Sequence, residues 1–192
     1  MSAEHASYWL CAVWYVTWWI PALWSQKAAR RLPVGAGNLD RLITGVGAAL
    51  VFLVIAPRPG RPSLFAPLWT ASPMVNWALV LVMLASFAFC WWARVHMGRL
   101  WSGLVTVKPD HYVVDTGPFR LVRHPIYSGV IAGALCVALI KATPAALVGE
   151  VLFALGFWLT ARKEERFLRE SLGAEAYDAY SRRTGMLLPF VG

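Results

Sequence analysis

Five apolar segments dominate the chain, and they constrain its fold more than any other feature. They lie at residues 8–24, 42–56, 74–93, 126–140 and 145–161. A helix that crosses the hydrocarbon core of a bilayer needs roughly 20 residues, and only 74–93 has that length. Each shorter segment, taken alone, also fits a buried core helix or a re-entrant piece. The composition, 58% hydrophobic with 11 Trp and only 15% charged, departs from that of soluble globular chains and favours a membrane protein.

The positive charges alternate with the apolar segments. Of the 18 Lys and Arg residues, 15 lie in 25–41, 94–125 and 162–192, and the other connections hold three. This bias is typical of loops that stay in the cytoplasm. The sequence therefore predicts an all-α integral membrane protein with about five transmembrane helices, the N-terminus outside and the C-terminus inside.

The chain has a net charge of +8, and nearly all of the excess positive charge lies in these three loops. On that side it would meet the headgroups of anionic membrane lipids. Nucleic-acid binding is the other reading of a basic chain, but no separate basic domain supports it, so no nucleic-acid partner is expected. Cys11, Cys90 and Cys136 lie in apolar segments without a CxxC spacing or a His to complete a metal site. We interpret them as packing residues and expect no metal.

Polar chemistry concentrates at the ends of the last two segments, which a short turn at 141–144 joins. An antiparallel hairpin returns its far ends to one membrane depth, so Arg123-His124-Pro125 should approach Arg162-Lys163-Glu164-Glu165. Each residue also has a purely structural reading: Pro125 as a first-turn proline, Tyr127 as an interfacial anchor, and the Glu pair as partners of tail cations. Their concentration at one place favours a functional site.

The second half of the chain carries a longer pattern. Arg94 and 98–102 precede the segment 108–119, and then come Arg123-His124-Pro125-x-Tyr127-x-Gly129, Glu164-Glu165-x-x-Leu168, Gly173, Tyr177, Tyr180 and 188–190. In order and spacing this set resembles the isoprenylcysteine carboxyl methyltransferases and their bacterial and archaeal relatives, which share the signature with phospholipid N-methyltransferases. The resemblance divides the single membrane domain, 1–192, into a structural part at 1–91 and a catalytic part at 92–192.

The pattern departs from the family at Phe119, where Tyr is common, so a hydrogen bond from a hydroxyl at that position is lost. The fourth segment also lacks the Trp that often follows the Tyr-x-Gly. The first two segments carry no resemblance.

The resemblance implies S-adenosylmethionine as the methyl donor, bound on the cytoplasmic side without a Rossmann fold by the loop before the fourth span and the C-terminal tail. The sequence agrees in lacking a dinucleotide-type glycine fingerprint after a strand. Backbone groups of a strand-like piece at 113–117 are expected along the adenine, and a Glu on the ribose or the ammonium. The implied cofactor-binding residues are Lys108, His111, Val113, Val114, Gly117, Arg123, His124, Pro125, Tyr127, Glu164 and Glu165.

A carboxylate acceptor needs a cation to hold it, and Arg, which grips both oxygens, suits that role. Arg94 and Arg162 are therefore predicted catalytic residues, with Arg99 as a further candidate. Glu165 is also predicted to be catalytic, in addition to its place among the cofactor-binding residues. An amine acceptor would instead need a group that takes a proton, so the many Arg residues favour carboxyl O-methylation over phospholipid N-methylation. The lipophilic or lipid-modified substrate is expected to enter from the bilayer. A membrane scaffold without catalysis is the remaining alternative, and Glu150, inside the fifth segment, is an open question.

Overall fold

A computed structural model of the chain describes residues 1–18, 20, 30–31, 39–53, 63–101, 106–107 and 112–189. The long helices of this part support the predicted all-α class. Its elements are α1 (Ala3–Trp18), β1 (Arg30–Arg31), α2 (Leu39–Phe52), α3 (Pro73–Met97), η2 (Gly98–Leu100), β2 (Thr106–Val107), η3 (Gly117–Arg120), α4 (Pro125–Lys141), α5 (Pro144–Leu172) and α6 (Ala174–Ser181). The two-residue strands β1 and β2 pair antiparallel.

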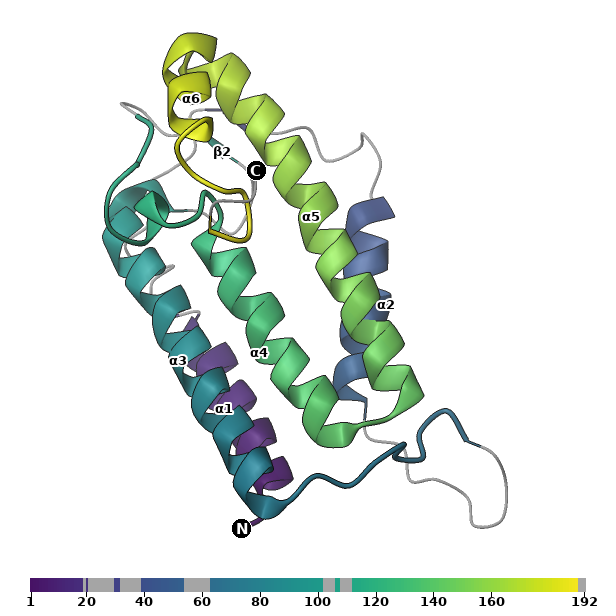
Figure 1. Cartoon of the computed structure of the whole chain (residues 1–192). Coiled ribbons are helices and arrows are strands. Elements are labelled where there is room, and N and C mark those ends of the chain that lie inside the picture. The colour runs from purple at the N-terminus through teal and green to yellow at the C-terminus, as the bar shows by residue number, and fades with distance from the viewer. Residues whose placement is uncertain are drawn as a thin grey trace.

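The long helices run side by side, with α4 between two helix pairs (Figure 1). Helices α3 and α1 pack on one side of α4, and α5 with α2 on the other. Helices α4 and α5 form the predicted hairpin, which turns at Ala142 and Thr143. The opposite end of the bundle, where α4 begins and α5 passes into α6, is called the site end below.

Prolines and capping hydroxyls determine where α3 and α5 begin. The Ser72 hydroxyl accepts a hydrogen bond from the Val75 amide, and the Thr143 hydroxyl accepts one from the Ala146 amide. A proline follows each cap, at the position where a missing N–H costs nothing. Helix α5 continues well past the apolar segment 145–161, because the Arg, Lys, Glu and Leu residues that follow are good helix formers.

Glycines allow α5 and α2 to approach closely. A Cβ atom on Gly149 would lie 2.6 Å from the Leu50 Cβ, and one on Gly156 would lie 2.7 Å from the Thr44 backbone nitrogen. Neither position tolerates a side chain without a shift of the helices. Small residues at a helix contact of this kind are typical of membrane bundles, where they let backbones come together.

Two helical segments are long and apolar enough to cross a bilayer: Pro73–Leu100, which combines α3 and η2, and Pro144–Leu172, which is α5. Helices α1, α2 and α4 are shorter, with 16, 14 and 17 residues. By length and composition, two of the five expected spans are therefore met within the described residues. Together with the exposed large apolar side chains along the helices, these segments indicate a membrane protein.

Candidate active site

The hairpin brings the two predicted motifs into contact at the site end. The Arg123 Nε lies 2.6 Å from Oε1 of Glu165, and its Nη2 lies 3.4 Å from Oε2. The His124 Nε2 lies 3.3 Å from the same Oε1. The predicted approach of Arg123-His124 to the Glu pair is thus confirmed, across more than 40 residues of sequence.

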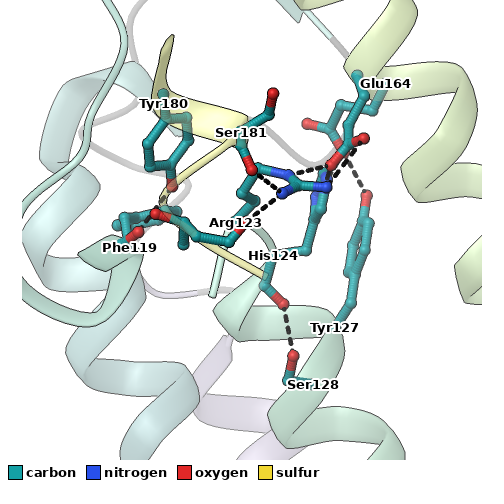
Figure 2. Close-up of polar contacts among 10 residues, drawn as sticks. Phe119, Arg123, His124, Tyr127, Ser128, Glu164, Tyr180 and Ser181 are labelled. Atoms are coloured by element: carbon teal, nitrogen blue, oxygen red, sulfur yellow. Dashed lines mark hydrogen bonds and ion pairs between the residues drawn. The ribbon is translucent and has the colours of Figure 1, made fainter. Parts of the chain in front are cut away.

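Arg123 also holds the end of α6 and the C-terminal tail, the name used here for residues 182–189. Its Nη1 donates to the carbonyl oxygens of Ser181, at 3.0 Å, and Thr184. Only 6% of the Arg123 side chain is exposed, so the guanidinium donates its hydrogen bonds to protein groups and not to water. This geometry makes Arg123 a structural clamp between α4, α5 and the tail (Figure 2).

His124, Tyr127 and Glu164 form the polar surface next to this clamp. The Tyr127 hydroxyl donates to Oε2 of Glu164 at 2.9 Å, and the His124 Nδ1 lies 3.7 Å from that oxygen. The rings of His124 and Tyr127 stack with an interplanar angle of 3°. Figure 2 shows both rings projecting from the start of α4 toward Glu164 on α5. The carboxylate is oriented by the hydroxyl and remains partly accessible.

The tail lies against the start of α4 through backbone hydrogen bonds. The Arg123 amide donates to the Gly185 carbonyl at 2.8 Å, and the His124 amide donates to the Met186 carbonyl at 3.1 Å. The Ser128 hydroxyl donates to the Leu187 carbonyl at 2.6 Å. These bonds explain why the tail returns from α6 to α4 (Figure 1).

Tyr180 on α6 adds one further tie. Its hydroxyl donates to the Phe119 carbonyl at 2.7 Å. Burial raises the pKa of Tyr180 well above its usual value, so the hydroxyl stays protonated and remains a donor. The family's Tyr hydroxyl is absent at Phe119, but the backbone of that residue is held in place all the same.

A cavity of about 380 Å³, here called the first cavity, opens beside this polar surface. Its volume is within the range of small-molecule sites. Arg123, His124, Tyr127 and Glu164 supply polar groups on one side. The rest of the lining comes from apolar and aromatic side chains of α1, the end of α3 with the residues just after it, the loop before α4, α4, α5 and α6: Trp14, Tyr15, Trp18, Met97, Leu100, Trp101, Val113, Val114, Phe119, Pro125, Ile126, Val130, Phe157, Leu168, Leu172, Tyr177 and Tyr180.

Tryptophans of α1 build much of the apolar wall, which sequence reasoning missed. Trp14 stacks on Phe87 with ring centroids 4.8 Å apart and on Trp18 at 4.9 Å. Trp18 meets the edge of Trp101 at 5.7 Å. The signal in the sequence was the excess of aromatic residues in the first segment, more than an interfacial belt requires.

Of the predicted cofactor-binding residues, those that line the first cavity are Val113, Val114, Arg123, His124, Pro125, Tyr127 and Glu164. Glu165 faces the other side of Arg123. Gly117 has a φ of 58° and packs against the His96 ring. A strand-like piece was expected at 113–117, but residues 113–115 form no strand. Lys108 and His111 lie outside the described residues.

Neither predicted catalytic arginine lines the first cavity. Arg94 is fully buried; its Nη1 donates to the Gly98 carbonyl at 3.1 Å, and its guanidinium lies 3.9 Å from the centroid of the Trp101 ring. Arg162 is exposed on another face of α5, with its guanidinium 5.3 Å from the Trp158 ring centroid. Glu150 is buried and lines neither of the two cavities described here.

Arg162 belongs to a second cavity of about 580 Å³, formed by α5 and α6 on the far side of the Arg123–Glu165 ion pair. Arg123 and Tyr177 line both cavities. The ion pair is therefore part of the wall between them. The second cavity is lined by Arg123, Trp158, Leu159, Arg162, Lys163, Glu165, Arg166, Arg169, Tyr177, Asp178 and Ser181.

Comparison with known proteins gives matches to the part of the chain that contains the α4–α5 hairpin. Residues 78–170 match the model of the isoprenylcysteine carboxyl methyltransferase family. A probable protein-S-isoprenylcysteine O-methyltransferase from Oryza sativa subsp. japonica is 31% identical over 105 residues, 52% of this chain and 53% of that protein. The enzyme of that name from Saccharomyces cerevisiae is 33% identical over 100 residues, 49% of this chain and 40% of its own length. The chain thus spans about half the length of these curated relatives, or less.

A third relative has a different kind of name. The cobalt-zinc-cadmium resistance protein CzcN from Cupriavidus metallidurans is 27% identical over 164 residues, which cover 82% of this chain and 70% of that protein. Among the residues that the structure describes, no group of three or more His, Cys, Asp or Glu side chains is placed to hold a metal ion.

Proposed function

We propose that the chain is a member of the isoprenylcysteine carboxyl methyltransferase family and a membrane methyltransferase that uses S-adenosylmethionine to esterify a lipophilic carboxylic acid. The acceptor class is an isoprenylcysteine or a similar lipid-borne carboxylate. The observation that carries the proposal is the first cavity, which joins an ordered carboxylate, Glu164, to an apolar aromatic wall.

The residues present fit S-adenosylmethionine by their chemistry. Glu164, oriented by Tyr127, suits an ammonium group or the ribose hydroxyls, since an ionised carboxylate accepts several hydrogen bonds. The rings of His124, Tyr127 and Phe157 give faces on which a cation or an adenine packs. Val113 and Val114 offer apolar contact and backbone groups. Lys108, His111 and Gly117 complete the proposed cofactor-binding set.

When bound, S-adenosylmethionine supplies a methyl group that is attacked by the acceptor oxygen. An ionised carboxylate needs no general base, so the protein's task is to orient the acceptor and exclude water. The tail covers the start of α4 and is fixed there by Arg123, Ser128 and Tyr180. This cover, together with the buried ion pair of Arg123 and Glu165, keeps His124 in position.

The acceptor side of the proposal involves the tryptophans and the arginines. Trp14, Trp18 and Trp101 form the surface for the apolar part of the acceptor, which enters from the bilayer between α1 and α3. Arg94 acts as a positioning residue through Trp101, against which it lies. A direct role of Arg162 in holding the carboxylate stays a prediction, because that residue faces the second cavity and the acceptor would have to reach it past Arg123.

The remaining elements of the proposal concern topology. We propose one membrane domain of five spans. The two longer spans are α3 and α5, and the other three are α1, α2 and α4. The alternating Lys and Arg distribution supports an outside N-terminus and a site end in the cytoplasm. The residues 1–91 serve as structural support, although α1 also contributes to the cavity wall.

The proposed roles are separable by binding and transfer measurements on the purified full chain in lipid. Titration with S-adenosylmethionine is expected to give no measurable binding for His124→Ala and Glu165→Ala. Arg162→Ala is expected to bind the cofactor as the parent does and to lose transfer to a prenylcysteine. Arg120→Ala, an exposed arginine outside both cavities, is the control and should match the parent. Parent-like binding and transfer in all three site variants would refute these assignments.

A further inference from the structure

The second cavity is strongly basic, and its chemistry differs from that of the first. Its lining holds five cationic side chains and only two carboxylates, those of Glu165 and Asp178. Three of the cations have carboxylate partners. Arg123 pairs with Glu165 at 2.6 Å, Arg169 with Asp178 at 2.7 Å, and Lys163 with Asp40 of α2 at 2.9 Å.

Arg162 and Arg166 are the two remaining cations. In the part of the chain that the structure describes, neither has a carboxylate within ion-pair distance. They are four residues apart on α5 and both are exposed, so their like charges lie next to each other and repel. An anion held between the two guanidinium groups would remove this repulsion, and the planar donor fork of Arg suits a phosphate group.

The apolar surface that leads to these arginines indicates what kind of anion it is. Val148, Val151, Leu155 and Trp158 are exposed on the same stripe of α5, one turn after another. The stripe ends at Trp158, against whose ring the Arg162 guanidinium lies. It thus runs along the membrane-spanning part of α5 directly into the basic pair, where the apolar part of the helix ends.

We propose that the second cavity binds the headgroup phosphate of an anionic phospholipid between Arg162 and Arg166, with an acyl chain along the stripe from Trp158 to Val148. Trp next to Arg at the membrane surface is the arrangement that proteins use at headgroup depth. A free phosphate or an acidic peptide would satisfy the arginines but would make no contact with the apolar stripe. This inference does not depend on the proposed methyl transfer.

Native mass spectrometry of the full chain, released from nanodiscs that contain phosphatidylglycerol and phosphatidylcholine, tests the proposal. The parent should retain phosphatidylglycerol in preference to phosphatidylcholine. Arg166→Gln should lower that retention about fivefold, and the double variant with Arg162→Gln should lower it further. Arg162→Lys with Arg166→Lys keeps the charge and should restore part of the retention. The matched control is Arg41→Gln with Arg120→Gln, two exposed arginines outside the cavity.

Two further arms separate the lipid from other anions. Trp158→Ala should weaken phosphatidylglycerol retention, because it removes the ring at the end of the stripe that meets Arg162. Inorganic phosphate, added in excess, should not displace the lipid. Equal retention in the parent and the Arg166 variants, an equal loss in the control pair, or displacement by inorganic phosphate would each overturn the proposal. Thermal unfolding of Arg166→Gln, measured in parallel with the parent, reports whether the fold is intact.

Discussion

Replacement of Arg123 by Ala tests how the site end is held together. The change removes both contacts to Glu165 and both bonds to the carbonyls of Ser181 and Thr184. Loss of one partner from a buried ion pair typically costs about 3–5 kcal/mol, since the other charge is left without compensation. Glu165 is 17% exposed and keeps a contact with His124, so we expect the lower end, about 3 kcal/mol.

The free energy of unfolding is measurable by titration with sodium dodecyl sulfate in mixed micelles, with Arg120→Ala as the exposed control. That control should change stability by less than about 0.5 kcal/mol. Limited proteolysis is the second readout, because a tail freed from Arg123 should be cleaved between 177 and 189 before the helices are. A double variant, Arg123→Met with Glu165→Leu, should recover part of the stability, since it leaves no buried carboxylate alone.

The explanation fails if Arg123→Ala is as stable as Arg120→Ala and its tail is equally resistant to protease. The contacts of Arg123 would then contribute no net stability, and the residue would not hold the tail. If the tail is cleaved but stability is unchanged, the ion pair with Glu165 is energetically neutral and only the carbonyl bonds matter.

Three other substitutions test separate parts of the account. Tyr127→Phe removes the hydrogen bond that orients Glu164, and should weaken S-adenosylmethionine binding about tenfold in equilibrium dialysis, the loss of one charge-assisted bond. Trp14→Ala should raise the KM for a lipophilic acid about tenfold through lost apolar contact, with cofactor affinity unchanged. Gly156→Ala should destabilise the α2–α5 contact by about 1–3 kcal/mol in the detergent titration, whereas Gly45→Ala, which meets nothing within 4 Å, should not.

Local signals in the sequence were enough for the helices and the hairpin. Pro125, Thr143 and Pro144 mark where α4 and α5 begin, and the short turn between the two helices implies that their far ends meet. The contact of Tyr127 with Glu164 follows from that geometry. These features depend on near neighbours in the chain or on one short turn.

The grouping of Arg162 with Glu164 overlooked the helix periodicity, whereas Arg162 and Glu165, three positions apart, both line the second cavity. At about 100° per residue, positions 162 and 164 of one continuous helix point in nearly opposite directions. The apolar segment ends at 161, which hides the fact that α5 runs on to Leu172. Extending the helix through the charged residues would have placed Arg162 and Glu164 on different faces.

The tail and α1 were beyond prediction for another reason. The path of 182–189 depends on bonds from its carbonyls to the side chains of Arg123 and Ser128 and to the backbone N–H groups of Arg123 and His124, which no local pattern encodes. Aromatic residues are spread around helix α1, so its sequence does not show which rings face a neighbour. The position of Trp14 between Trp18 and Phe87 is decided by tertiary packing.

Transfer of a radiolabelled methyl group from S-adenosylmethionine decides whether the chain forms a methyl ester of a lipophilic acid. The purified chain in lipid would be offered a prenylcysteine, a free fatty acid and phosphatidylethanolamine, each in a separate reaction. We expect label on a carboxylic acid, released by mild base as for a methyl ester. Base-stable label on phosphatidylethanolamine, with none on either acid, would contradict it and make the protein an N-methyltransferase.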